Sequence, residues 1–129
     1  MGLFKNIFKT SSPSEKKVLP WISLTHLEQL EAIQNRSHDK LQIIFKHSTR
    51  CGISGMVLNQ FVYRFDLDEE RVDLYYLDLL ACRQLSDEVG YRFQVMHQSP
   101  QLLVIKKGEV IAHDSHGAIN TIDLNRFKF

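Results

Sequence analysis

The feature that most constrains this chain is an alternation of short apolar runs with helix-like segments. The run "LQIIF" (residues 41–45) is apolar at every position but Gln42, which is typical of a strand buried on both faces, and "RVDLYYLDLL" (residues 71–80) predicts a second buried strand. Between them, apolar residues recur at helical spacing over residues 52–65, which predicts an amphipathic helix with its apolar face toward the core. The residues of that face are Ile53, Met56, Val57, Phe61 and Phe65.

Two further helices are predicted beside these strands. After a short strand-like run, "WISL", Thr25 and Glu28 have the spacing of a capping box and predict a helix over about residues 26–36. The segment "LACRQLSDEVG" predicts another helix, ended by Gly90 in the C-cap position. Strands and helices therefore alternate through the first two thirds of the chain.

The last third has a different pattern. "QLLVIKK" and "EVIAHD" flank Gly108, which predicts a β-hairpin, and a final helix is expected over about residues 117–127. The predicted order is thus β-α-β-α-β-α-β-β-α. Strands that alternate with helices and then close with a hairpin favour an α/β fold, with a central mixed sheet flanked by helices.

The 129 residues suit one domain preceded by a tail. We expect a flexible tail over residues 1–19 and a folded domain over residues 20–129. Phe4, Ile7 and Phe8 could line one side of a short helix that touches a membrane, but the segment is short and runs into the polar stretch "TSSPSEKK". A flexible tail is therefore the preferred interpretation.

Composition excludes several kinds of partner and site. A formal net charge of +1 gives no overall field to steer the chain toward nucleic acid or an anionic membrane, so neither is an expected partner. Only two cysteines occur, Cys51 and Cys82, which fits a reducing cytoplasm better than a disulfide-stapled secreted scaffold. No stretch approaches the roughly 20 apolar residues of a membrane span, and no signal-peptide pattern is visible. We expect a cytoplasmic protein without stable membrane insertion.

Cys51 is the first candidate for chemistry. It stands in "FKHSTRCGIS" (residues 45–54), at the turn between a predicted strand and a predicted helix, where helical N–H groups stabilise negative charge. Helix N-termini and nearby cations can lower the pKa of a cysteine from near 8.5 to roughly 3.5–7.5. The candidate cations are Lys46, His47 and Arg50. Alternatively, Cys51 is only a small residue at a helix start and the cations are solvated.

Pro100 is the second candidate. It lies in "HQSPQLLVIKKGEV", directly before a predicted strand, where a proline invites a cis peptide bond and a backbone stretch outside the ladder. Such an edge could receive an extended substrate. The alternative is an ordinary loop proline at the first residue of a strand.

Together these features resemble the thioredoxin fold, which places a reactive cysteine at the start of its first core helix and a cis-proline before its hairpin. Thioredoxins carry Cys-x-x-Cys, whereas this chain has Cys51-Gly52-Ile53-Ser54, with serine where the resolving thiol would stand. The resemblance implies a thioredoxin-like fold and monothiol exchange.

Within that superfamily, "FKHSTRCGIS" and "SPQLLVIKKGEVIAHDSH" look like the YtxJ-type monothiol bacilliredoxins of the bacillithiol system, from about Trp21 to the C-terminus. The resemblance implies that Cys51 attacks bacillithiol attached to client proteins, with bacillithiol as thiol cosubstrate and no bound cofactor. It also implies that cations near Cys51 bind the carboxylates of the malyl group. The residues expected to bind substrate are Lys46, His47, Arg50, Ser54, Ser99 and Pro100.

Three other interpretations remain open to test. Monothiol glutaredoxins, which share an iron–sulfur cluster, have a similar Cys-Gly-Phe-Ser motif, but the Gly-Gly-x-Asp turn of that family is replaced here by "AHDSHG". A non-catalytic module could use the Pro100 edge to bind an extended peptide. A metal site is not favoured, because no paired Cys-x-x-Cys occurs; the residues considered were His47, Cys51, His97, His113 and His116.

Cys82 lies among apolar residues and is expected to be a core thiol.

Overall fold

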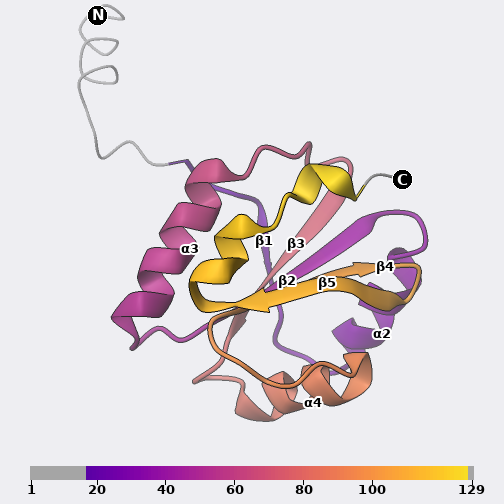
Figure 1. Ribbon diagram of the computed structural model, residues 1–129. Helices are drawn as coiled ribbons and strands as arrows, with labels where there is room; N and C mark the ends of the chain where they lie inside the picture. Colours follow the sequence, from indigo (N-terminus) through magenta and orange to yellow (C-terminus); the bar gives the residue numbers. More distant parts are fainter. Residues whose placement is uncertain (1–16, 128–129) are drawn as a thin grey trace, which may run out of the picture.

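The computed structural model describes residues 17–127 and contains one five-stranded mixed sheet in the order β1-β3-β2-β4-β5 (Figure 1). β1, β3 and β2 run parallel to one another, whereas β4 is antiparallel to β2 and β5 is antiparallel to β4. The mixed sheet predicted from the alternation is confirmed. The strands are β1 (Trp21–Ser23), β2 (Leu41–His47), β3 (Val72–Asp78), β4 (Gln101–Lys106) and β5 (Glu109–Ser115).

Helices cover both faces of this sheet (Figure 1). α3 and two short 3₁₀ helices pack on one face, and α2 and α4 pack on the other. Each face therefore encloses its own hydrophobic cluster, and β2 contributes side chains to both. The helices are α2 (Glu28–Arg36), α3 (Gly52–Arg64), α4 (Arg83–Phe93), η1 (His116–Thr121) and η2 (Leu124–Arg126).

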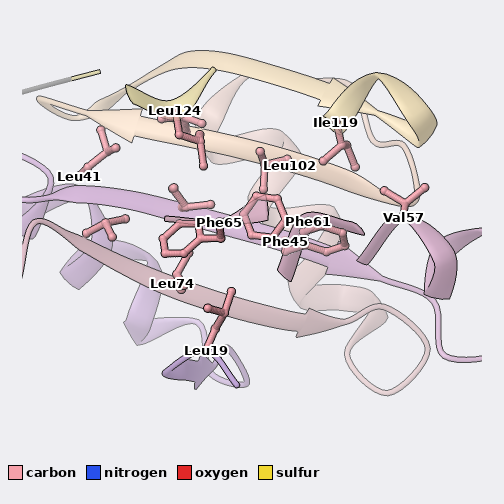
Figure 2. Close-up of a cluster of buried hydrophobic side chains, with 13 residues drawn as sticks. Leu19, Leu41, Phe45, Val57, Phe61, Phe65, Leu74, Leu102, Ile119 and Leu124 are labelled. Atoms are coloured by element: carbon pink, nitrogen blue, oxygen red, sulfur yellow. The ribbon is translucent and has the colours of Figure 1, made fainter. Parts of the chain in front are cut away.

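Aromatic contacts fix α3 on the sheet (Figure 2). Phe45 of β2 lies with its ring centroid 5.4 Å from that of Phe61, and Phe61 in turn lies 5.7 Å from Phe65. All three rings are buried, and burial of one such side chain contributes roughly 1.5–3 kcal/mol. This packing sets where the first turn of α3 emerges, at the carboxyl end of β2.

The first turn of α3 differs from the predicted apolar face. Val57, Phe61 and Phe65 are buried as predicted, but Ile53 and Met56 are 61% and 59% exposed. In the first turn it is Ser54 that is buried, where it contacts His47 at the end of β2, so Ile53 and Met56 lie to the sides of the buried face. Apolar spacing alone does not show how wide the buried face of a helix is.

α4 begins and ends later than predicted. It ends with Gln94 in the left-handed conformation (φ 57°), so Gly90 is inside the helix and is not its C-cap. A Cβ at Gly90 would lie 2.9 Å from the carbonyl oxygen of Val95, where the chain turns back over the helix. Gly90 is thus required by this close approach, and not by a turn conformation.

The predicted capping box and C-terminal helix are also corrected. α2 begins at Glu28, and Gln29 Oε1 accepts the backbone N–H groups of Thr25 (2.7 Å) and His26 (2.9 Å) in place of a Thr25–Glu28 box. The helix predicted over residues 117–127 is replaced by η1 and η2. Asp123 interrupts it, because its carboxylate accepts the backbone N–H of Asn125 (3.1 Å) and favours a local turn.

The hairpin is confirmed and is tied to the end of α2. Lys107 and Gly108 both have positive φ (54° and 83°), as a two-residue type I′ turn requires. The N–H of Lys107 donates to the carbonyl of Ser37 (2.8 Å), and the N–H of Gly108 donates to the Ser37 hydroxyl (2.7 Å). This anchor fixes the position of β4, whose first residue follows Pro100.

The N-terminal boundary lies earlier than predicted. Leu19, which the sequence assigns to the tail, is 7% exposed and belongs to the core cluster on the α3 face (Figure 2). Lys17 Nζ donates to the carbonyl of Phe65. The remainder of the predicted tail, with Phe4, Ile7 and Phe8, lies outside the described residues. Within residues 17–127, none of the helices is both long and apolar enough to cross a bilayer.

Candidate active site

The candidate site lies where the parallel strands end. β2 and β3 deliver their carboxyl ends to the N-termini of α3 and α4. β4 is antiparallel to β2, with Lys46 opposite Gln101, so β4 starts at this same end of the sheet. The turn that carries Cys51 and the loop that carries Pro100 therefore belong to one edge, where ligands of open α/β sheets commonly bind.

Cys51 is the N-cap residue of α3 and is exposed. Its backbone is extended (φ −105°, ψ 118°), its N–H donates to Ser48 (3.1 Å), and its carbonyl accepts the N–H of Gly55 (3.0 Å). The helix is 13 residues long, and the partial positive charge of its N-terminus favours an anion at this position. The geometry thus presents an accessible sulfur at the N-terminus of a helix.

Ser54 holds the turn before Cys51 in place. Its hydroxyl is fully buried, lies 2.7 Å from His47 Nδ1, and accepts the backbone N–H of Ser48 (3.1 Å). These two hydrogen bonds connect the first turn of α3 to the end of β2. Ser54 is therefore part of the scaffold beneath Cys51, although it was predicted to bind substrate.

His47 is buried on the same face as α3. Its ring packs against Tyr76 with 5.7 Å between centroids. Burial lowers the pKa of His47 below its ordinary value of 6.5, and the charge of Asp78 opposes this shift only in part. His47 is consequently uncharged at neutral pH and does not supply the positive charge predicted for it.

Lys46 is also buried, but on the opposite face of the sheet. Its Nζ donates to the carbonyl of Ser86 in α4 (3.1 Å) and lies 3.3 Å from Nδ1 of His97. Burial lowers the pKa of Lys46 to about 8, and the charge of Asp87 opposes this shift. With no exposed surface, Lys46 cannot contact a substrate in this arrangement. Of the three predicted cations, only Arg50 is exposed.

The Ser99–Pro100 peptide bond is cis, as predicted. Pro100 is buried, and its carbonyl accepts the backbone N–H of His116 (3.0 Å), so this oxygen is used within the fold and is not free for a substrate. Ser99 is half-buried, and its hydroxyl oxygen is buried without a hydrogen-bond partner among the described residues.

Cys82 occupies a comparable place on the next strand. It is the N-cap residue of α4, is half-buried, and packs against the hydrophobic cluster on the α4 face. Cys82 thus packs against the core, but it is half-buried and not the fully buried core thiol that was predicted. Within residues 17–127, no three His, Cys, Asp or Glu side chains are grouped so that they could hold a metal ion.

Sequence reasoning missed the polar residues that support the Pro100 loop. Gln101 is buried in β4, and its Nε2 donates to the carbonyl of Met96 (2.9 Å). Ser86 and His97 meet Lys46 on the α4 face. A usable signal was present, because Lys46 directly follows the apolar run of β2 and Gln101 directly precedes that of β4. Polar residues at the ends of buried strands need partners.

An exposed cysteine at the start of α3, a buried serine one turn later and a cis-proline before β4 define a thioredoxin-fold protein with a monothiol redox site. Comparison with known proteins makes this more specific. The family model of the monothiol bacilliredoxin BrxC matches residues 22–124. The chain belongs to this family.

Solved structures agree on the fold. A solved chain described as having a thioredoxin fold is 33% identical, with a TM-score of 0.69 over 82% of this chain and 91% of that chain. Thioredoxin from Malassezia sympodialis is 20% identical (TM-score 0.62, covering 83% and 90%). A thioredoxin from Nicotiana alata is 21% identical (TM-score 0.58, covering 86% and 91%). Family and fold together support a redox function.

Proposed function

We propose that this protein is a thiol–disulfide oxidoreductase that removes bacillithiol from S-bacillithiolated client proteins in the cytoplasm. The observation that best supports the proposal is the exposed Cys51 at the N-terminus of α3, with a buried serine in place of a second thiol. Membership of the monothiol bacilliredoxin family points to bacillithiol as the small thiol.

The reaction proceeds in two exchange steps. The Cys51 thiolate attacks the bacillithiol sulfur of the client mixed disulfide; a Cys51–bacillithiol disulfide forms and the client leaves as its thiolate. A second bacillithiol thiolate then attacks the bacillithiol sulfur held on Cys51. Bacillithiol disulfide is released and the Cys51 thiolate is restored, so the two electrons that reduce the client come from bacillithiol.

The environment of Ser54 supports the need for an external thiol in the second step. A serine hydroxyl cannot form a disulfide, and this hydroxyl is already engaged by His47 and by the N–H of Ser48. Cys82 begins a different helix and packs against the core on the α4 face. The adduct on Cys51 therefore persists until bacillithiol arrives.

Substrate binding is proposed for a smaller set of residues than the sequence suggested. Arg50 is exposed next to Cys51 and is the cation proposed to bind the carboxylates of the malyl group. Ser99 and Pro100 are proposed to align the client backbone. Lys46 and His47 are left out because both are buried and make hydrogen bonds within the fold.

Removal of the adduct from a purified client tests the proposal. A single-cysteine client carrying bacillithiol is mixed with the protein and excess bacillithiol, and the client mass is followed with time. Wild-type protein and Cys82→Ser should both remove the adduct, whereas Cys51→Ser should not exceed bacillithiol alone. Equal rates for Cys51→Ser and wild type would reject the enzyme and favour a peptide-binding module.

A further inference from the structure

Lys46 is the most deeply buried charged side chain near the site, and its partners lie on other elements. It belongs to β2, five residues before Cys51, and has no exposed surface. Its Nζ donates to Ser86 of α4 (3.1 Å) and contacts Nδ1 of His97 (3.3 Å), in the loop between α4 and β4. One side chain therefore links the strand that leads to Cys51 with the loop that leads to Pro100.

The loop over residues 94–100 is held from inside at two successive points. Gln101 Nε2 donates to the carbonyl of Met96 (2.9 Å), and Lys46 Nζ meets the ring of the next residue, His97. Lys46 and Gln101 are opposite each other in the ladder between β2 and β4. Val95 and Pro100 are buried, whereas Met96 and His97 between them are exposed, so Gln101 and Lys46 hold the exposed part of the loop from inside.

The chemistry of the contact determines its direction. A lysine ammonium can only donate, so His97 Nδ1 must accept, and the proton of the neutral ring is on Nε2. Burial lowers the pKa of His97, and the charge of Lys46 lowers it further, with Asp87 opposing and Arg83 adding to the decrease. His97 is thus neutral at pH 7 and available as the acceptor.

Stability alone does not account for a lysine at this position. In residues 17–127 no carboxylate lies within ion-pair distance of Lys46, whereas Lys40 at the start of β2 pairs with Asp73 (3.0 Å). Because burial lowers the pKa of Lys46 to about 8, the folded chain binds this proton less tightly than the unfolded chain. The buried charge therefore destabilises the fold at pH 7, and that cost becomes smaller as the pH rises above 8.

We propose that Lys46 is a positioning residue that holds the loop over residues 94–100, and with it Ser99 and Pro100, in the arrangement that aligns a client disulfide with Cys51. The effect on client exchange rests on the proposed function. The contact between Lys46 and the loop does not depend on the proposed function, and it can be measured separately.

The test compares Lys46→Met with Lys40→Met. Lys46 lies near the carboxyl end of β2, and Lys40 directly precedes its first residue. Lys46→Met keeps the length and apolar stem but removes the donor. Hydrogen exchange should become about tenfold faster at the backbone amides of residues 94–99 and remain unchanged in α3. The melting temperature at pH 7 should stay the same or rise, because an uncompensated buried charge is removed. Lys40→Met should lower stability and leave exchange in the loop unchanged.

Activity gives the second readout. Lys46→Met should raise the KM for a bacillithiolated client about fivefold and leave alkylation of Cys51 by iodoacetamide at the wild-type rate, since that small reagent does not need the loop. If wild-type protein removes no bacillithiol, the proposed function fails, and hydrogen exchange alone then decides the role of Lys46.

Two results would overturn the role of Lys46. One is unchanged exchange over residues 94–99 in Lys46→Met. The other is uniformly faster exchange throughout the chain with a lower melting temperature, which would indicate a purely structural lysine. If Lys46→Met fails to fold, His97→Ala breaks the same contact from the loop side and should give the same local increase; no increase there would also reject the proposal.

Discussion

Two helices of this protein have comparable starts, each with a cysteine as N-cap that stands four residues after the last residue of a parallel strand. Cys51 follows β2 and begins α3, and Cys82 follows β3 and begins α4. The turn before α3 is held by Ser54, which belongs to that helix. The turn before α4 is held by Asp78, the last residue of β3. The Asp78 carboxylate accepts the N–H groups of Leu80 (3.1 Å) and Ala81 (3.4 Å).

The difference between these helix starts lies in their surroundings. Cys51 is exposed, and its strand pairs directly with β4, which begins after Pro100. Cys82 is half-buried against the core, and its strand lies between β1 and β2, away from β4. The proposed redox role of Cys51 therefore rests on more than its place at a helix N-terminus. Exposure and the neighbouring Pro100 loop distinguish Cys51.

The largest expected contrast is in alkylation. Iodoacetamide should modify Cys51 more than about tenfold faster than Cys82 in the folded protein, because Cys51 is exposed and Cys82 is half-buried. The two rates should converge in denaturant, and peptide mass spectrometry measures both in one sample. Similar rates in the folded protein would remove the distinction between the two helix starts.

The two turns can be compared by removing what holds each one. Ser54→Ala leaves His47 Nδ1 and the Ser48 N–H without their buried partner. This substitution should lower the free energy of unfolding by about 2–3 kcal/mol and reduce the rate of client exchange about fivefold. Asp78→Ala should cost about 0.5–2 kcal/mol and change the exchange rate less than about twofold. Equal losses of activity in the two variants would contradict a specific role for the first turn.

The turn before α3 should also make stability depend on pH, because Ser54, which holds that turn, contacts the buried ring of His47. Its folded-state pKa lies below 6.5, so as the pH falls below 6.5 the unfolded chain takes up a proton that the folded chain does not, and stability is lost. His47→Gln should lose less stability than wild type between pH 7 and pH 5 in urea titrations. The pKa of Asp73 lies below 3.8, so protonation of Asp73 lowers the stability only at a pH below this range. Parallel curves for the two proteins would show that burial of His47 has no such effect.

The smallest expected effect is that of Cys82→Ser. This thiol packs at the edge of the α4-face cluster, so its loss should lower the unfolding free energy by about 1 kcal/mol or less and change client exchange less than about twofold. Steady-state exchange with bacillithiol and urea unfolding measure the two quantities. A large loss of exchange with intact stability would make Cys82 a resolving thiol.

The arrangement of the sheet could be predicted because its signals are local. Three local patterns each indicate one type of secondary structure: the apolar run of β2, the periodicity of α3 and the residues around the Gly108 hairpin. Two errors in the helices have different causes. Gly90 is required by a tertiary contact, the approach of Val95, whereas Asp123 interrupts the last helix through a local hydrogen bond that its own side chain accepts from the Asn125 N–H.

The site could be predicted in part for a related reason. The place of Cys51 at the start of α3 and the cis bond at Pro100 were predicted correctly from position and motif, whereas the expected cluster of cations is not formed. β2 extends two residues further than the apolar run suggests, and successive side chains of a strand point to opposite faces. Lys46 and His47, adjacent in sequence, therefore lie on opposite sides of the sheet, and only Arg50 stays at the surface.

The central claim is that Cys51 takes the bacillithiol from the client. Its most direct test is a single-turnover reaction of reduced protein with a bacillithiolated client, without free bacillithiol, quenched by acid and analysed by peptide mass spectrometry. The account predicts that bacillithiol appears on the peptide containing Cys51 in step with the loss of bacillithiol from the client. An adduct on the Cys82 peptide, or a client that keeps its bacillithiol, would contradict it.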